Sequence, residues 1–119
     1  MEIKISSKIF PTENKMKLVG VMKTTFPGCI FLISKDKIEC ITKDQNVLSV
    51  LKETIDKKRI RHTVHYLIVK NQTSSGTKLE LNKQTLVLGK INFVEESYPL
   101  GNIVIETDIP QELLTYFTN

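Results

Sequence analysis

Long apolar runs are absent from the sequence: no stretch approaches the roughly 20 residues that a helix needs to cross a bilayer. The first ten residues, MEIKISSKIF, alternate apolar and polar side chains, which predicts a strand and not a signal peptide. Only two cysteines occur in 119 residues, too few for a disulfide framework. We therefore expect a cytoplasmic protein with no membrane partner, folded as a single domain over residues 1–119.

Catalytic and metal-binding motifs are also missing. The sequence has no GxSxG, P-loop or GxGxxG motif, and the acids Glu95 and Glu96 diverge because they are neighbours in one turn. His62 and His65 lie three residues apart, but no CxxC, HxH or HExxH pattern supplies the further ligands that zinc requires. These absences predict a protein that is not an enzyme and that uses no metal, no cofactor and no small-molecule substrate.

The two cysteines fall in a predicted hairpin, whose strands are CIFLIS and KIECIT joined by Lys35-Asp36. This pairing puts Phe31 opposite Cys40, and one face is then formed by Cys29, Phe31, Ile33, Ile38 and Cys40. Cys29 and Cys40 become diagonal neighbours, which is a poor geometry for a disulfide. We expect both thiols to act as small core side chains.

The apolar pattern predicts strands and helices in alternation. Residues 2–10 form a strand, and a helix capped by Thr12 runs to about Phe26; its buried stripe is Met16, Val19, Met22 and Phe26. KLEL, INFV and NIVIETD predict strands, NKQTLVLG fits a short helix or a strand, and Pro110 begins a closing helix. The order β-α-β-β-α-α-β-(short element)-β-β-α predicts an α+β fold, with an antiparallel or mixed sheet backed by helices on one side.

Two helices are predicted in the middle of the chain. Asp44 can cap the first, which buries Leu48, Leu51 and Ile55. The step of five residues from Ile55 to Ile60 does not fit one helix face, so we expect a turn near Asp56-Lys57. The next helix then runs from about Lys58 to Val69, and NQTSSG, residues 71–76, forms a loop.

Positive charge is concentrated in this central region. The net charge is +4, yet residues 1–72 carry 14 Lys/Arg and 7 Asp/Glu, whereas residues 73–119 carry 3 and 6. On the third predicted element, one face is apolar, with Ile60, Val64, Leu67 and Ile68. The opposite face holds Lys58, Arg61, His62 and His65, flanked by Arg59 and Tyr66.

A helix face with cations and no acids repels itself, and a bound polyanion would remove this cost. The arginines can form bidentate bonds to phosphate, and Tyr66 offers a ring on which a base can stack. The alternative is the solvated face of a lysine-rich protein.

Asn82, Lys83 and Gln84 lie between a predicted strand and an apolar run. Amide and ammonium groups beside a helix N-terminus favour an anion. The alternative is a polar cap, formed by Asn82, on a structural turn. A deep pocket that combines these three residues with a histidine would instead favour an enzyme.

The segments RIR, residues 59–61, and LNKQTLVLGKINFVEESYPLG, residues 81–101, resemble an uncharacterised archaeal family of predicted RNA-binding proteins, also described as predicted exosome subunits. The first strand and PTE, residues 11–13, fit the same pattern. The resemblance implies an RNA-linked function and a fold similar to that of the large-subunit ribosomal protein that binds 5S ribosomal RNA. Its motif positions in this chain are Arg59, Arg61, Asn82, Lys83, Gln84 and Lys90.

The chain departs from this family at two positions. The family often has an acid where the chain has His62, and a proline where it has Asn102. With His62 in place of an acid, the basic face lacks a negative charge that the family often has, which indicates a more anionic partner.

Two functions are consistent with these features. The first is a small non-enzymatic RNA-binding protein, an accessory to RNA processing that binds RNA or another polyanion with weak sequence specificity. Its candidate RNA-binding residues are Lys57, Lys58, Arg59, Arg61, His62, Tyr66, Lys83 and Lys90. The second is a protein-interaction or homodimerisation module, whose basic face meets an acidic protein and whose NIVIETD strand adds to a neighbouring sheet.

Overall fold

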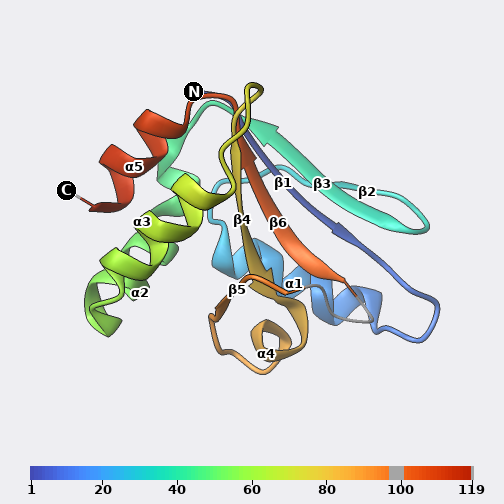
Figure 1. Cartoon of the computed structure of the whole chain (residues 1–119). Coiled ribbons are helices and arrows are strands. Elements are labelled where there is room, and N and C mark those ends of the chain that lie inside the picture. The colour runs from blue at the N-terminus through green and yellow to red at the C-terminus, as the bar shows by residue number, and fades with distance from the viewer. Residues whose placement is uncertain (97–100, 119) are drawn as a thin grey trace.

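Six antiparallel strands form one sheet in the order β2-β3-β1-β6-β4-β5 (Figure 1). The computed structural model describes residues 1–96 and 101–118. The strands are β1 (Ile3–Lys8), β2 (Leu32–Ile33), β3 (Lys37–Thr42), β4 (Thr77–Asn82), β5 (Phe93–Val94) and β6 (Asn102–Thr107). The helices are α1 (Lys15–Thr25), α2 (Ser49–Lys58), α3 (Arg61–Lys70), α4 (Lys83–Val87) and α5 (Pro110–Thr118), with a 3-10 turn, η1 (Gln45–Leu48), before α2. This order confirms the predicted α+β fold.

The helices cover one face of the sheet, and the hydrophobic core lies between the helices and this face. In β1 the buried Ile3 and Ile5 alternate with the more exposed Lys4 and Ser6, as a strand with one buried face requires. In Figure 1, α2, α3 and α5 lie together on one side of the sheet. We call the other side the open face. No helix among the described residues is long and apolar enough to span a membrane.

The predicted free edge of NIVIETD is wrong. This segment forms β6, which lies inside the sheet and pairs with β1 on one side and β4 on the other. Its core-facing Ile103 and Ile105 are fully buried, so the last strand enters the centre of the sheet because that position buries its apolar side chains best. The edge strands are β2 and β5, each of two residues.

The hairpin register is confirmed, although its first strand is shorter than predicted. Leu32 pairs with Glu39 and Ile33 with Ile38, the register that sets Phe31 opposite Cys40. Cys40 is buried, and the half-buried Cys29 packs against the core. Both thiols therefore pack with apolar side chains, as expected.

The first helix begins later than the sequence predicts. Asn14, not Thr12, is its N-cap, and Asn14 Oδ1 accepts a hydrogen bond from the backbone N–H of Lys17 at 3.1 Å. With this start, Leu18 joins Val19 and Met22 on the buried stripe, whereas Met16 is 79% exposed. The predicted burial of Met16 is therefore wrong.

The break between the two middle helices is confirmed, but it lies nearer to Arg59 than to Asp56-Lys57. Asp44 caps η1 through a hydrogen bond from the N–H of Asn46 at 2.9 Å, and Leu48, Leu51 and Ile55 are buried as predicted. α2 ends at Lys58 and α3 begins at Arg61. The turn lets Ile60 pack against the core, which one continuous helix would prevent.

Candidate functional site: a basic pocket

A basic pocket lies between the end of α2 and the segment that follows α4. It has a volume of about 360 Å³ and is lined by Thr54, Lys57, Lys58, Gly89, Lys90, Ile91 and Asn92. Lys58 Nζ donates a hydrogen bond to the carbonyl oxygen of Ile91 at 2.8 Å, across 33 residues of sequence. This contact brings Lys90 to the same pocket as Lys57 and Lys58, although no local pattern in the sequence pairs them.

Arg59 follows α2 in a left-handed backbone conformation, with φ of 54°. The N–H groups of Arg59 and Ile60 donate to the carbonyls of Asp56 and Ile55, which is the hydrogen-bond pattern of a Schellman motif. Glycine is the usual residue at this position, since a side chain in the left-handed region costs about 1–2 kcal/mol. Arg59 is the one non-glycine residue with positive φ in the described part of the chain, and its side chain is exposed.

The cations around this junction are paired to different extents. Arg61 Nε lies 2.9 Å from Asp56 Oδ1, and Lys57 Nζ lies 3.7 Å from Glu53 Oε1. The expectation of a face without counter-charges is therefore wrong for Arg61, because Asp56 of α2 lies within reach. Lys57, another candidate RNA-binding residue, is also paired with an acid of α2. Among described residues, neither the Arg59 guanidinium nor the Lys90 ammonium has an ion-pair or hydrogen-bond partner. All these cations are exposed, so the two ion pairs contribute little to stability and leave the cations accessible.

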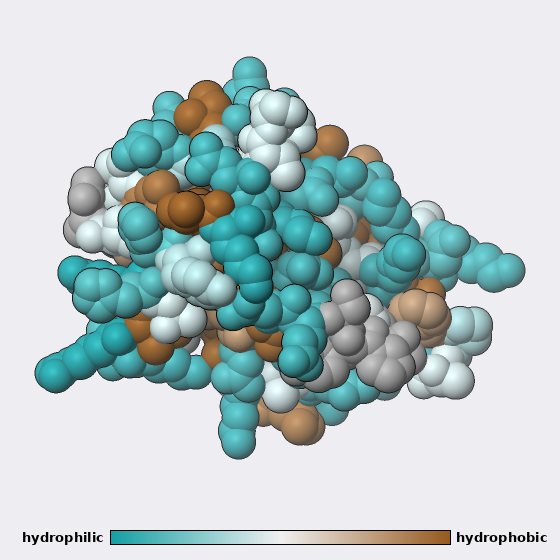
Figure 2. Space-filling view, viewed as in Figure 1, coloured by the Kyte–Doolittle hydropathy of each residue, from teal (hydrophilic) through white to brown (hydrophobic). Residues whose placement is uncertain are grey.

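The predicted single basic helix face is also wrong, because the helix ends within it. Lys57 and Lys58 belong to α2 and Arg59 to the turn, whereas Arg61 and His62 begin α3. Hydrophilic side chains project at the lower left of Figure 2, where Figure 1 places α2. The positive charge thus surrounds a helix junction instead of lining one helix.

The aromatic candidate, Tyr66, is half exposed on α3. Lys70 Nζ lies 5.7 Å from the centre of its ring, a cation–π contact. Lys70 also forms an ion pair with Glu95, and the hydrogen bond from Lys70 to this carboxylate raises the pKa of the Lys70 ammonium. Tyr66 therefore already has a cation beside its ring, and a stacked base would compete with Lys70.

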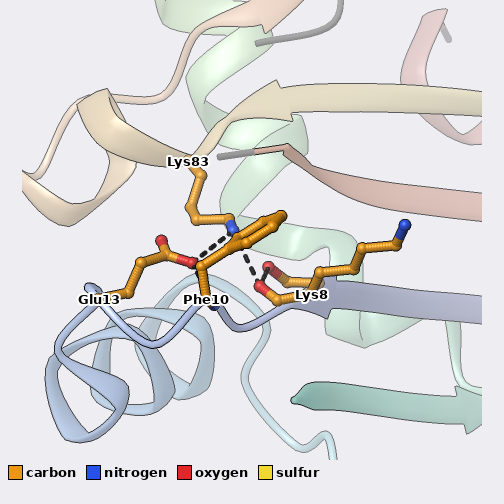
Figure 3. A network of polar contacts seen from close by, with 5 residues as sticks. Lys8, Phe10, Glu13 and Lys83 are labelled. Carbon is orange, nitrogen blue, oxygen red and sulfur yellow. Dashed lines mark hydrogen bonds and ion pairs between the residues drawn. The ribbon is translucent and has the colours of Figure 1, made fainter. Parts of the chain in front are cut away.

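Lys83 must be removed from the candidate RNA-binding residues. Its side chain is 1% exposed and points into the protein, where Nζ donates to the carbonyl oxygen of Lys8 at 2.8 Å and to Glu13 Oε1 at 3.0 Å (Figure 3). The ring of Phe10 lies 5.3 Å from the same ammonium. A buried ammonium with these partners cannot reach a phosphate on the surface. The prediction that Lys83 contacts RNA is therefore wrong.

Within the LNKQ signature, Asn82 and Lys83 serve the fold. Asn82 caps α4, since its Oδ1 accepts a hydrogen bond from the N–H of Thr85 at 3.1 Å. Lys83 is buried while Gln84 is exposed, so these residues do not converge on one pocket as an enzyme site would require. Local patterns in the sequence did not indicate the contact between Lys83 and Glu13. The family resemblance marked the two segments that contain these residues, LNKQ and PTE, but did not pair them.

The two histidines, His62 and His65, are both exposed on α3. In the part of the chain that the structure describes, no group of three or more His, Cys, Asp and Glu side chains could hold a metal ion.

Comparison with known proteins identifies relatives over nearly the full chain. No protein-family model matches the chain. It is 30% identical over 122 residues to UPF0201 protein PH1010 of Pyrococcus horikoshii, covering 97% of this chain and 87% of that protein. It is 28% identical over 108 residues to a UPF0201 protein of Methanothermobacter thermautotrophicus, covering 90% and 81%. The crystal structure of a UPF0201 protein from Methanococcus jannaschii is similar, with a TM-score of 0.80 at 26% identity, covering 100% of this chain and 94% of that one.

Proposed function

The chain belongs to the UPF0201 family of archaeal proteins, and we propose that it is a small RNA-binding protein that contacts phosphates through the basic pocket. The proposed role is binding without catalysis. An association with an RNA-processing complex such as the exosome, and a likeness to the ribosomal protein that binds 5S RNA, belong to the same hypothesis.

The observation that carries the proposal is the convergence of lysines from distant segments on one pocket. Lys57 and Lys58 come from α2, and Lys90 comes from the segment after α4. Three ammonium groups around one depression repel one another, whereas a phosphate placed between them would be attracted by all three. Arg59, which the Schellman motif holds in the left-handed region, adds an exposed cation beside the pocket.

The pocket favours contacts with the RNA backbone over base recognition. Lysine ammonium groups are point charges without a fixed hydrogen-bond fork, and they read no base edge by themselves. We therefore expect weak sequence specificity and an affinity that falls steeply with salt. Arg59 would add a bidentate phosphate contact beside the pocket.

The experiment measures the affinity for a fluorescent single-stranded RNA at several salt concentrations. The test variant is Lys57→Ala/Lys90→Ala, which removes two pocket charges. The matched control is Lys23→Ala/Lys35→Ala, which removes two exposed charges elsewhere and gives the same net charge. In the test variant, the slope of log affinity against log salt should fall by about 1.4, from roughly 0.7 per phosphate contact on single strands.

The control variant should keep the slope of the wild type. Equal losses in the two variants would mean that the RNA responds to net charge alone. An unchanged affinity in the test variant would remove the pocket from the proposal.

A second candidate function, protein interaction, is favoured by an apolar cluster near the β2 edge. Ile30, Leu32 and Ile41 are 85%, 70% and 60% exposed. Adjacent exposed apolar side chains at the edge of a sheet are typical of surfaces that bind another protein or a second copy of the chain. The mass in solution tests this candidate: a dimer that becomes a monomer in Leu32→Lys/Ile41→Lys supports it, and a monomeric wild type excludes homodimerisation.

A further inference from the structure

A second pocket lies on the open face of the sheet and shares no residue with the basic pocket. It has a volume of about 320 Å³ and is lined by Ser6, Ser7, Lys8, Lys37, Glu80, Gly101, Asn102 and Val104. The strand register sets Lys37 opposite Lys8, Ser6 opposite Val104, and Val104 opposite Glu80. The pocket is thus a depression across four adjacent strands, β3, β1, β6 and β4. We call it the sheet pocket.

Asn102 gives this pocket a buried polar atom without a partner. The residue is 8% exposed, and its Nδ2 donates to the carbonyl oxygen of Glu96 at 2.8 Å and to Glu80 Oε1 at 3.4 Å. Its Oδ1 accepts no hydrogen bond from any described residue. Because Asn102 alternates with the core-facing Ile103, its side chain lies on the open face, at the pocket. Buried polar atoms are rarely unpaired, so among the described residues this oxygen stands out as an acceptor free for the donor group of a bound molecule.

The other side of the sheet pocket is positively charged. Lys8 and Lys37 face each other across β1 and β3, and directly opposed like charges destabilise a sheet. Lys37 is compensated by Glu39, whose Oε2 lies 3.0 Å from Lys37 Nζ, and the hydrogen bond from Lys37 lowers the pKa of the Glu39 carboxyl. The Lys8 ammonium has no acidic partner in the described ranges. An anion bound here would relieve the repulsion.

We propose that the sheet pocket binds a nucleoside monophosphate, with its phosphate at Lys8 and Lys37 and a base N–H donating to Asn102 Oδ1. Asn102 is one strand away from Lys8 and two strands away from Lys37, which separates the backbones of the acceptor and the cations by roughly 5 to 10 Å. A nucleotide separates its phosphate from its base by a similar length, whereas an amino acid holds its two charges on neighbouring atoms. The pocket volume lies in the range of small-ligand sites.

The hydrogen-bond pattern also selects among bases. Because the Asn102 amide N–H groups are already bonded to Glu96 and Glu80, the groups left for a base at this end of the pocket, Asn102 Oδ1 and the Glu80 carboxylate, accept hydrogen bonds. Adenine, cytosine and guanine carry amino groups that can donate to Asn102 and Glu80. Uracil presents its single ring N–H between two carbonyl oxygens, which Glu80 repels. AMP, CMP and GMP should therefore bind more tightly than UMP.

The test is an NMR titration of the full ¹⁵N-labelled chain with AMP, CMP, GMP, UMP, adenosine and inorganic phosphate. At least one amino-bearing nucleotide should shift the amides of Ser6, Lys8 and Asn102 and bind more tightly than UMP, adenosine or phosphate. Lys8→Ala should weaken its binding about tenfold, the effect of losing one charge-assisted hydrogen bond. Lys4→Ala, a control on the same strand and face but outside the pocket, should leave the affinity within about twofold.

Asn102→Ala should abolish the preference for amino-bearing bases while binding of phosphate persists. If this variant does not fold, two comparisons still test the proposal. The first compares Lys8→Ala with Lys4→Ala, and the second compares AMP, CMP and GMP with UMP. The proposal is overturned if no nucleotide binds at millimolar concentration, if phosphate binds as tightly as the nucleotides, or if Lys4→Ala weakens binding as much as Lys8→Ala. None of these results depends on RNA binding at the basic pocket.

Discussion

Lys83 and Glu13 form a buried ion pair that joins the start of α4 to the segment before α1. Glu13 Oε1 also accepts a hydrogen bond from the backbone N–H of Phe10 at 2.9 Å, so one carboxylate oxygen holds two segments that lie 70 residues apart. The side chains of Lys83 and Glu13 are 1% and 11% exposed. Two signature segments of the sequence, PTE and LNKQ, thus meet in the folded chain.

Removing one partner of this pair should destabilise the protein strongly. Lys83→Met leaves the Glu13 carboxylate buried without its cation, and we expect a loss of about 3 kcal/mol in the free energy of unfolding. Lys83→Met/Glu13→Gln should recover part of this loss, because the neutral amide still accepts from Phe10 and leaves no unpaired charge. Urea denaturation measures both values. The exposed neighbour provides a control, Gln84→Met, with an expected change within about 0.5 kcal/mol. Strictly additive losses in the double variant would contradict the coupling.

Arg59→Gly should separate stability from function. Glycine adopts the left-handed conformation without steric cost, so we expect the free energy of unfolding to rise by about 1 kcal/mol. Affinity for single-stranded RNA should fall, because an exposed cation beside the basic pocket is lost. Thermal unfolding and RNA titration of the same preparation give both quantities. A variant that is more stable and binds RNA as well as the wild type would show that Arg59 has no role in binding.

Gly76→Ala and Gly20→Ala should change stability in opposite directions. A Cβ on Gly76, whose φ is +140°, would lie 1.9 Å from the carbonyl oxygen of Thr107, and the sheet must shift to admit it. We expect a loss of more than about 2 kcal/mol. A Cβ on Gly20, in the middle of α1, meets nothing within 4 Å, and alanine there should add about 0.5–1 kcal/mol. Chemical denaturation of the two variants measures whether the free energy of unfolding falls in Gly76→Ala and rises in Gly20→Ala. A Gly76→Ala protein of wild-type stability would contradict the close approach of Gly76 to Thr107.

The thiol of Cys29 should react slowly and should make the fold sensitive to alkali. Burial, followed by the hydrogen bond with Cys40, raises the pKa of Cys29 to about 12. At pH 8, alkylation by iodoacetamide should be on the order of a thousandfold slower than for free cysteine. Because the folded pKa is raised, this thiol stabilises the fold below its ordinary pKa of 9.0, and the contribution is lost as pH rises toward 12. Mass spectrometry of native and urea-unfolded protein gives the comparison, and equal rates would refute it.

Acid should weaken the contact between the N-terminus and the end of β6. The N–H of Glu2 donates to Asp108 Oδ1 at 2.8 Å, and this hydrogen bond lowers the pKa of the Asp108 carboxyl. The resulting stability is present above the ordinary pKa of 3.8 and is lost as pH falls below it through the lowered value. Asp108→Asn should therefore show a smaller loss of melting temperature below about pH 4 than the wild type does. Identical acid profiles of the two proteins would count against the contact.

Local patterns in the sequence predicted the elements well, because they depend on neighbouring residues. The alternation in β1, the cap at Asp44 and the five-residue step from Ile55 to Ile60 are all read within one turn or strand. The position of β6 inside the sheet could not be read in this way, because strand order depends on which apolar faces fit together in space.

The candidate sites show the same division. The sequence alone determined the α+β class, the hairpin register and the presence of cations around residues 57–61, since each follows from side-chain periodicity or composition over a few residues. Only the tertiary structure decided that Lys83 is buried against Glu13, that Lys90 joins Lys57 and Lys58, and that Asn102 lies beside Lys8. These side chains are far apart along the chain, and ion pairing and burial depend on distances that exist only after the sheet and helices have packed.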